Sequence, residues 1–353
     1  MSGESDDESD AVVVHCGSFQ TLAGFAGNDS PTVVMQTIVG RGLNDVALVG
    51  CDALRKQRGR WAISRPIQGG VVQDWDDLER VWHHLFYSEL RVRPEDTPVL
   101  VTEVPLCPKH QREELVRVLI EDFDVPSVFL CSRSVLALYA SGRTTGLVVS
   151  VGHTVSHTVP VYEGFALPHA TMVAEMGGRD ADAALVRLCR LQGEDAEWIR
   201  NVKHAVVAVV EEGEVGDSIE LAAPGGTMVL GPDRNLAAAG LLQPGIYGKD
   251  CPGLHHLAQQ SVQRADPELM PELVRSVVLA GGGTMFRGLD TRLKKELEHL
   301  WSQQVNVIAA PERRSSQWIG GSIFASLNGT RHMRVTRALL KKYGPEVVHR
   351  MCF

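Results

Sequence analysis

Three consecutive glycines form the strongest candidate for a ligand-binding turn in this sequence. The turn consists of Gly281, Gly282 and Gly283. It follows the apolar residues 277–280, which predict a buried strand, and precedes residues 289–300, which predict a helix. A glycine turn at this place lets a ligand approach backbone N–H groups at a helix N-terminus, where anions bind. The alternative interpretation is a tight strand-to-helix turn without a ligand.

Two stretches far apart in the chain each predict a β-hairpin closed at a glycine. Residues 11–25 and 147–161 both contain a β-branched run, then a small polar turn, then a stretch that predicts a returning strand. The turns contain His15, Gly17 and Ser18 in the first stretch, and Ser150, Gly152 and His153 in the second. The repeated pattern suggests two related domains, each opening with such a hairpin.

Predicted helices and strands alternate between and after these hairpins. Residues 75–90 and 108–122 each carry an apolar stripe at helical spacing, and residues 98–102 predict a strand between them. Residues 180–191 and 195–211 predict two further helices in the second half. This alternation favours an α/β architecture with a partly parallel sheet.

Length and composition narrow the class of protein. A chain of 353 residues is long enough for two domains of about 150 residues each. Hydrophobic residues make up 44% and charged residues 22%, which is typical of a globular chain and not of a disordered or membrane protein. The net charge of −8 argues against a nucleic-acid surface, because phosphate neutralisation needs clustered cations.

The seven cysteines are scattered and never spaced C-x-x-C. We therefore expect neither a disulfide framework nor a zinc ribbon, and a reducing compartment is favoured.

Residues 1–10 are acidic and rich in serine, which predicts a disordered tail and no secretory signal. No apolar run approaches the roughly 18 residues that a membrane span needs. Neither G-x-x-x-x-G-K-[ST] nor G-x-S-x-G occurs, so an independent hydrolase site has no support.

Several long segments resemble the actin family, in the order in which that family has them. These segments are residues 82–109, 138–146, 157–170, 310–327 and 349–353. The resemblance covers residues 11–353 and implies the two-domain α/β fold that actins share with heat-shock chaperones and sugar kinases. In that fold the two hairpins are phosphate-binding loops on either side of a central nucleotide cleft. The implied domains are 11–140 plus 316–353, and 141–315, after the acidic tail 1–10.

The resemblance also implies that the side chains needed for ATP hydrolysis are missing. Three carboxylates and a lysine of the family fall on His15, Ser150, His153 and Leu22, its water-orienting glutamine falls on Arg133, and a histidine near its phosphate-release path falls on Gly69. Among these groups only His157 keeps its family identity. Because carboxylates are needed to hold hydrated Mg²⁺, we expect no Mg²⁺ site and absent or vestigial ATPase activity.

Binding of ATP or ADP without a metal stays open as an alternative, because backbone N–H groups need no carboxylate. The candidate N–H groups are those of Gly17, Ser18, Gly152, Gly281, Gly282 and Gly283. A zinc or copper site made by His15, His153 and His157 with Cys16 is a second alternative. We favour the interpretation that these side chains fill space by hydrogen bonding, and we expect no metal, since their spacing matches no local metal motif.

Two further departures concern assembly and partners. The family loop that contacts the next filament subunit is short here, with only residues 42–48 after Arg41, and residues 193–244 also look shortened. An ordinary actin-type filament is therefore not expected. Tyr139, Gly142 and the terminal Cys352–Phe353 match the end of the family's fold where actin-binding proteins dock.

The predicted function is a catalytically degenerate, actin-like scaffold that acts through cytoskeletal or actin-binding protein partners. We expect a cytoplasmic, cytoskeletal location, of the kind known for divergent sperm-head members of the family. The alternatives are an ATP-binding, filament-forming member with residual ATPase activity, and a nuclear subunit of a chromatin complex. The missing Asp and Lys side chains favour the scaffold.

Overall fold

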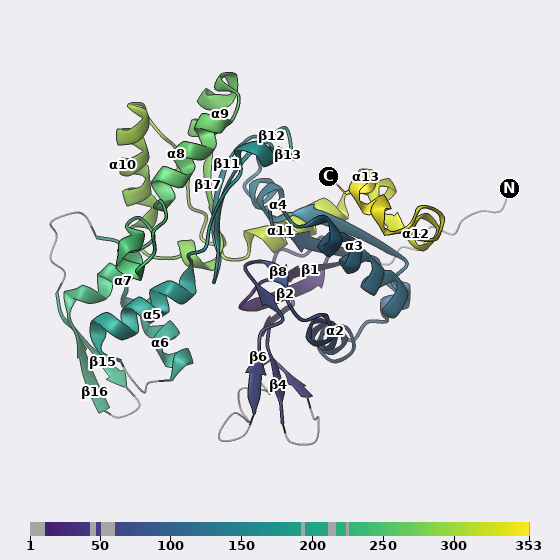
Figure 1. Ribbon diagram of the computed structural model, residues 1–353, viewed down its shortest axis with the longest axis horizontal. Helices are drawn as coiled ribbons and strands as arrows, with labels where there is room; N and C mark the ends of the chain where they lie inside the picture. Colours follow the sequence, from purple (N-terminus) through teal and green to yellow (C-terminus); the bar gives the residue numbers. More distant parts are fainter. Residues whose placement is uncertain are drawn as a thin grey trace. The chain divides into compact units, whose positions relative to one another are not determined.

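The computed structural model describes residues 11–42, 47–50, 61–191, 195–210, 217–223 and 226–352 (Figure 1). The chain divides into two compact units. Unit 1 consists of Met1–Ala140 and Gln317–Phe353, and unit 2 of Ser141–Ser316. Ser316, which the sequence assigned to the first domain, belongs with unit 2. The acidic residues 1–10 lie outside the described residues.

Unit 1 contains a six-stranded sheet with the order β19-β10-β9-β1-β2-β3. Its strands are β1 (Val12–Cys16), β2 (Gln20–Phe25), β3 (Val33–Gln36), β9 (Val99–Glu103), β10 (Ser127–Ser132) and β19 (Val335–Thr336). The predicted hairpin is confirmed, because β1 and β2 pair antiparallel around Gly17. β1, β9 and β10 run parallel, so their carboxyl ends share one edge of the sheet.

The helices of unit 1 bury their apolar stripes against this sheet. They include α2 (Trp75–His83), η2 (His84–Leu90), η3 (Pro94–Asp96), α3 (Lys109–Arg117), η4 (Val118–Asp122), α4 (Arg133–Ala140), α11 (Ser316–Ser326), η10 (Asn328–Met333), α12 (Arg337–Tyr343), η11 (Pro345–Val347) and α13 (Val348–Met351). Asp74 caps α2 by accepting a hydrogen bond from the backbone N–H of Asp77 at 2.9 Å. The buried Trp318 of α11 donates from Nε1 to the carbonyl of Val13 in β1 at 3.0 Å. Both ends of the chain therefore build this core.

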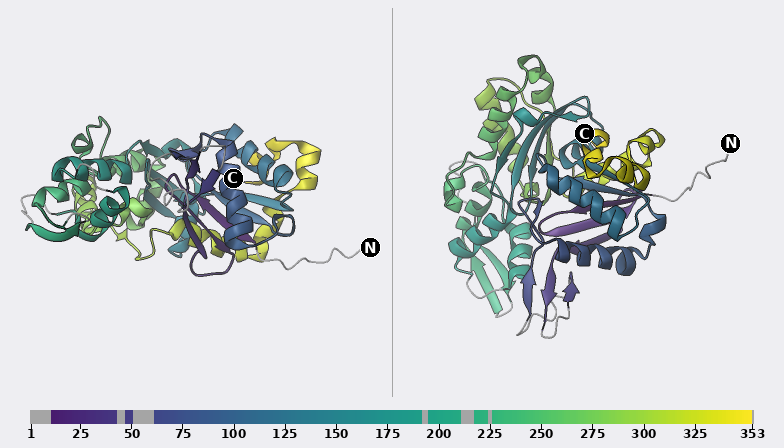
Figure 2. Two further views of the ribbon diagram at one scale, coloured as in Figure 1. Left: turned by 90° about the horizontal axis from the view of Figure 1, so that it is seen from below. Right: turned by 45° about the vertical axis from the view of Figure 1, so that its right-hand side comes forward.

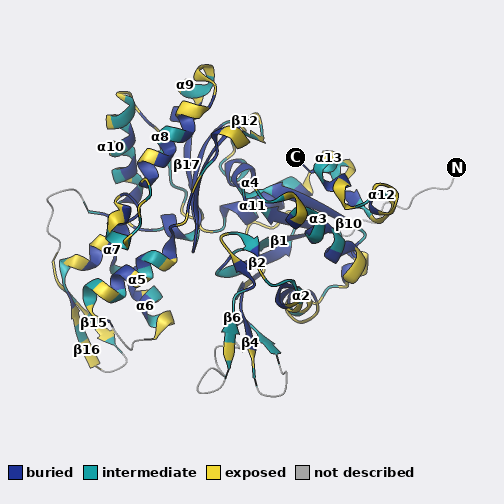
Figure 3. Ribbon diagram, in the orientation of Figure 1, coloured by how far each residue is buried: buried dark blue, intermediate teal, exposed yellow. Residues whose placement is uncertain are grey.

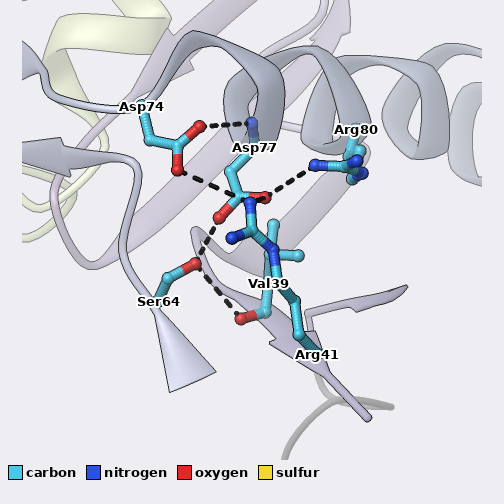
Figure 4. Close-up of polar contacts among 6 residues, drawn as sticks. All are labelled: Val39, Arg41, Ser64, Asp74, Asp77 and Arg80. Atoms are coloured by element: carbon cyan, nitrogen blue, oxygen red, sulfur yellow. Dashed lines mark hydrogen bonds and ion pairs between the residues drawn. The ribbon is translucent and has the colours of Figure 1, made fainter. Parts of the chain in front are cut away.

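A small sheet projects from unit 1 and is fastened to α2 by one buried carboxylate. The sheet has the order β5-β4-β6, with β4 (Val39–Arg41), β5 (Ala47–Val49) and β6 (Ala62–Ser64), and a separate pair consists of β7 (Ile67–Gln68) and β8 (Val71–Val72). Asp77 is fully buried and lies 2.7 Å from Nη2 of Arg41 and 3.0 Å from Nη1 of Arg80 (Figure 4). Ser64 donates a hydrogen bond to the same carboxylate. Residues 43–46 of the shortened loop lie outside the described residues.

Unit 2 repeats the strand arrangement of unit 1. Its sheet has the order β13-β12-β11-β17-β18, and β14 also pairs with β12. The strands are β11 (Gly146–Val151), β12 (Ser156–Tyr162), β13 (Phe165–Ala166), β14 (Met172–Ala174), β17 (Val277–Ala280) and β18 (Val307–Ile308). An antiparallel hairpin is again followed by parallel strands, as predicted, and β17 is buried throughout (Figure 3).

The helices of unit 2 form two groups, one beside this sheet and one beyond an end of its strands, next to a two-stranded sheet (Figure 2). The elements are η5 (Pro168–Ala170), α5 (Gly178–Cys189), α6 (Ala196–Val206), β15 (Ile219–Ala223), β16 (Gly226–Leu230), η6 (Pro232–Asn235), α7 (Leu236–Ala239), η7 (Pro244–Tyr247), α8 (Leu254–Arg264), η8 (Pro267–Leu269), α9 (Met270–Arg275), η9 (Gly282–Thr284) and α10 (Leu289–Trp301). The expected helix 195–211 ends early, at Val206. Beyond it the N–H of Val209 donates to the carbonyl of Arg287 at 2.8 Å. The β-branched residues after Val206 therefore pair with a distant segment and do not continue the helix. None of the described helices is long and apolar enough to span a bilayer.

Candidate functional site

The candidate site of unit 1 lies where three parallel strands end. His15 lies near the end of β1, Thr102 near the end of β9, and Arg133 directly follows β10. Ligands of α/β sheets bind outside the carboxyl ends of the strands, so this edge is the expected place for a site. Nδ1 of His15 lies 2.7 Å from Oγ1 of Thr102. Thr102 was not predicted, because nothing in the sequence links it to the first hairpin.

Arg133 places a half-buried cation at this edge. One of its terminal nitrogens, Nη2, donates to the backbone carbonyl of Cys16. Its Nε has no hydrogen-bond partner in the described part of the chain. Burial lowers the pKa of Arg133, although this guanidinium still carries the charge. Burial, and next the charge of Arg133, hold the pKa of His15 well below its usual 6.5, so this imidazole is neutral.

Cys16 is a core side chain and not a free thiolate. Its Sγ accepts hydrogen bonds from Nε1 of Trp82 at 3.3 Å and from Oγ1 of Thr21 at 3.7 Å. Burial raises its pKa, so a thiolate ligand is disfavoured. Among the residues that the structure describes, no group of three or more His, Cys, Asp or Glu side chains could hold a metal ion.

The turn of the first hairpin is closed by its own backbone. The N–H of Gly17 donates to the carbonyl of Gln20 at 2.8 Å, and a Cβ on Gly17 would lie only 2.9 Å from that oxygen. Arg65 donates to the carbonyl of Ser18 at 3.3 Å, and its guanidinium lies 5.3 Å from the ring centre of Phe19. Arg65 is a second residue of this turn that the sequence did not reveal.

The structure also places Leu22 and Gly69, the two other degenerate positions that the sequence predicted in unit 1. Leu22 lies in β2 opposite His15 and is part of the apolar core. Gly69 lies exposed in the turn between β7 and β8, with a φ of +60°. Neither residue offers a polar side chain to a ligand.

The second turn, in unit 2, is tied to the start of α5. Ser150 of β11 and His157 of β12 are Cα partners, and both are buried. The N–H of Gly152 donates to Val155 within the turn. The carbonyls of Gly152 and His153 accept hydrogen bonds from the N–H groups of Gly178 and Arg179 at 2.9 and 2.8 Å. The first helical amides of α5 are therefore occupied by the turn.

A buried ion pair lies beside this helix start, and sequence reasoning missed it. Nζ of Lys203 in α6 lies 2.7 Å from Oδ1 of Asp182 in α5 and donates to the carbonyl of Gly178 at 3.1 Å. Burial lowers the pKa of Lys203 and raises that of Asp182. The pair links α6 to the first turns of α5, next to the second hairpin turn.

The triple glycine follows β17 at the edge where Ser150 lies, because Ala280 is the Cα partner of Ser150. Gly281 has a φ of +86°, and a Cβ there would lie 2.5 Å from the carbonyl oxygen of Val151. A Cβ on Gly283 would lie 2.3 Å from Cγ1 of Val151. Gly282 has no such neighbour. Close packing therefore accounts for two of the three glycines, as the interpretation without a ligand requires.

Three of the six backbone N–H groups expected to bind a nucleotide are already bonded within the chain. Gly17 and Gly152 donate to their own turns, and Gly281 donates to the carbonyl of Arg313 at 2.9 Å. These three amides therefore already have partners within the chain, and their role in nucleotide binding stays a prediction. The expectation for Ser18, Gly282 and Gly283 also stays a prediction.

Two α/β units, each with a glycine-closed hairpin, parallel strands and polar residues at their carboxyl edge, define an actin-like fold. The family model described as Actin matches residues 6–208 and 222–353. The chain belongs to the actin family.

Proposed function

We propose that this actin-family protein is a catalytically degenerate scaffold that acts through protein partners and does not hydrolyse ATP. The observation that carries the proposal is the replacement of the metal-holding groups by side chains that bond within the chain. His15 contacts Thr102, and Arg133 donates to the carbonyl of Cys16. These contacts stabilise the first turn without any ligand.

The electrostatics of the first turn support this proposal. Hydrated Mg²⁺ needs carboxylate and carbonyl oxygen atoms. A neutral imidazole is a poor ligand for this ion, and a nearby guanidinium repels it. The same cation favours a bare anion, and Nε of Arg133 has no partner among the described residues. Metal-free binding of ATP or ADP is therefore a second candidate.

The proposed partner surface lies around Tyr139 and Gly142, which match the end of the family's fold where actin-binding proteins dock. The ring of Tyr139 stacks on Phe324 of α11 at 6.0 Å. Ile323 of the same helix and Leu327, directly after its end, are exposed. Cys352 takes no direct part, because it is fully buried and its Sγ accepts from the N–H of Leu130. Exposed apolar side chains of this kind mark protein contacts. Phe353 lies outside the described residues.

The test is a calorimetric and thermal-shift titration of the purified protein with ATP, first with Mg²⁺ and then with EDTA. A ligand that binds the native state raises its apparent stability. We expect no Mg²⁺-dependent shift and no release of phosphate. A shift equal in both buffers would support the metal-free nucleotide. A shift that needs Mg²⁺, with turnover, would contradict the proposal and favour the filament-forming ATPase.

The scaffold role has a separate test. Ile323→Ser with Leu327→Ser should remove protein partners recovered from cells, whereas Val229→Ser, an exposed apolar residue of unit 2, should not. Fractionation of the same cells distinguishes the proposed cytoskeletal location from a nuclear chromatin complex.

A further inference from the structure

The C-terminal part of unit 1 is basic in an acidic protein. Residues 328–352 contain six Arg and Lys but only one acidic residue, Glu346, whereas the whole chain has a net charge of −8. Five of these cations lie on η10, α12 and the segment between them. We call Arg331, Arg334, Lys341 and Lys342 the basic face. Charge of one sign gathered on neighbouring elements creates a local field that attracts an anionic partner.

The cations of the basic face have no ion-pair partner among the described residues. By contrast, the neighbouring Arg337 pairs with Asp124 at 3.1 Å. Nζ of Lys342 lies over the ring of Tyr343 at 4.7 Å, which leaves its charge uncompensated. Burial and the like charge of Arg331 lower the pKa of Arg334. An added anion would relieve this repulsion.

The described chain begins beside this face. Ala11 lines the same small cavity as Thr330 and Arg334. The ten residues before it include five carboxylates and no Lys or Arg. The carboxylates are those of Glu4, Asp6, Asp7, Glu8 and Asp10. At about 3.3–3.6 Å per residue, residues 4–10 reach up to ~25 Å from Ala11, which is enough to pass along α12.

We propose that the acidic residues 4–10 bind the basic face of the same chain through ion pairs. Their attachment at Ala11 gives them an effective concentration that a separate acidic protein must exceed. The charges are opposite and similar in number, and a network of such pairs outweighs a single exposed pair. A protein partner with an acidic segment would therefore have to displace residues 4–10 from the basic face.

The test is zero-length cross-linking of the full-length protein with a water-soluble carbodiimide at low salt. The reagent joins a carboxylate and a lysine amine into an amide, and it is itself hydrated to a urea. Peptide mass spectrometry should find residues 4–10 joined to Lys341 or Lys342. Lys109, which is exposed on α3 of the same unit, is the internal comparison. The yield should fall several-fold in 0.5 M NaCl, because salt screens exposed charges.

A matched pair of variants separates specific pairing from chance encounter. Arg331→Gln with Arg334→Gln keeps both lysines but halves the charge of the basic face, and should lower the cross-link yield several-fold. Arg264→Gln with Arg275→Gln makes the same charge change on exposed residues of unit 2 and should leave the yield unchanged. Thermal unfolding checks that all the proteins are folded.

Three results would overturn the proposal. The first is equal cross-linking to Lys109, and the second is a yield unaffected by Arg331→Gln with Arg334→Gln. The third is a cross-link found only between labelled and unlabelled copies when the two are mixed, since the acidic residues would then bind a second chain.

Discussion

Nδ1 of His15 lies 2.7 Å from Oγ1 of Thr102, although 87 residues separate them in the sequence. The contact joins the ends of two parallel strands, at the position where the family resemblance predicts that a carboxylate has been lost. His15 is neutral there, because burial and then Arg133 lower its pKa. A neutral, hydrogen-bonded ring needs no counter-ion.

His15 should make the protein sensitive to acid. Its pKa is lower in the folded than in the unfolded chain, so below pH 6.5 the unfolded chain takes up the proton first. Stability is therefore fully present above pH 6.5 and is lost as the pH falls towards the folded-state pKa. One pH unit below the unfolded-state value, at pH 5.5, the loss can reach about 1.4 kcal/mol. Urea unfolding at pH 7.5 and 5.5 should show a smaller loss for His15→Asn, but an unchanged loss for His110→Asn, which alters an exposed histidine.

Arg133 should control the proton affinity of His15. Arg133→Gln removes a positive charge near the imidazole, so the pKa of His15 should rise in an NMR titration. The lost hydrogen bond to Cys16 should cost about 1 kcal/mol in chemical unfolding. Arg133→Lys keeps the charge and should leave the pKa of His15 low. An unchanged pKa in Arg133→Gln would contradict the electrostatic assignment.

Restoring the missing carboxylates should create a response to Mg²⁺. In His15→Asp with Ser150→Asp and His153→Asp, calorimetry should show at least a tenfold, ~1.4 kcal/mol, gain in affinity for Mg·ATP over the unmodified protein. The same three positions changed to Asn provide the control, because Asn has the shape but not the charge. Leu22 is left unchanged, since a lysine there would bury its charge in the core. Equal affinities of the Asp and Asn variants would mean that charge is not the missing element.

Adding a methyl group should lower the free energy of unfolding by different amounts at the three consecutive glycines. Gly281→Ala should lower the unfolding free energy by more than about 2 kcal/mol, because its φ of +86° and the carbonyl of Val151 both oppose a Cβ. Gly283→Ala should act similarly through Cγ1 of Val151. Gly282→Ala should change stability by less than about 0.5 kcal/mol. Equal losses at the three positions would contradict the packing interpretation.

Replacing Asp77 should lower the free energy of unfolding more than replacing its neighbour Asp76. Asp77→Asn removes the charge that holds Arg41 and Arg80 and should cost about 1–3 kcal/mol in urea unfolding. Asp76→Asn makes the same change at an exposed position of the same helix turn and should cost about 0.5 kcal/mol. Similar losses would mean that helix capping, and not the buried contact, is measured.

The sequence predicted the elements that depend on local pattern. Both hairpins, β17 and α10 follow from β-branched runs, glycines and an amphipathic stripe. The expected helix 75–90 is present, but its last part is the wider-wound η2, which apolar spacing does not distinguish from an α-helix. The early end of α6 was missed because pairing with Arg287 is a tertiary interaction.

The candidate site was only partly predictable for the same reason. Family resemblance marked His15 and Arg133, but not what they contact. The partners Thr102 and Arg65 are brought to the first turn by parallel strand pairing and by a separate loop, which leave no local pattern. The use of the Gly17 and Gly152 amides in turn closure depends on backbone geometry, which residue type alone does not fix.

The hydrogen bond from Trp318 to Val13 spans 305 residues and has a consequence for biosynthesis. A ribosome releases residues 11–140 first, but the core and sheet that they form are closed by α11 and β19 from the far end of the chain. The continuous segment Ser141–Ser316 is complete before those residues emerge. During translation the unit that begins first is therefore finished last, and its apolar sheet stays open to chaperones and to aggregation until synthesis is nearly over.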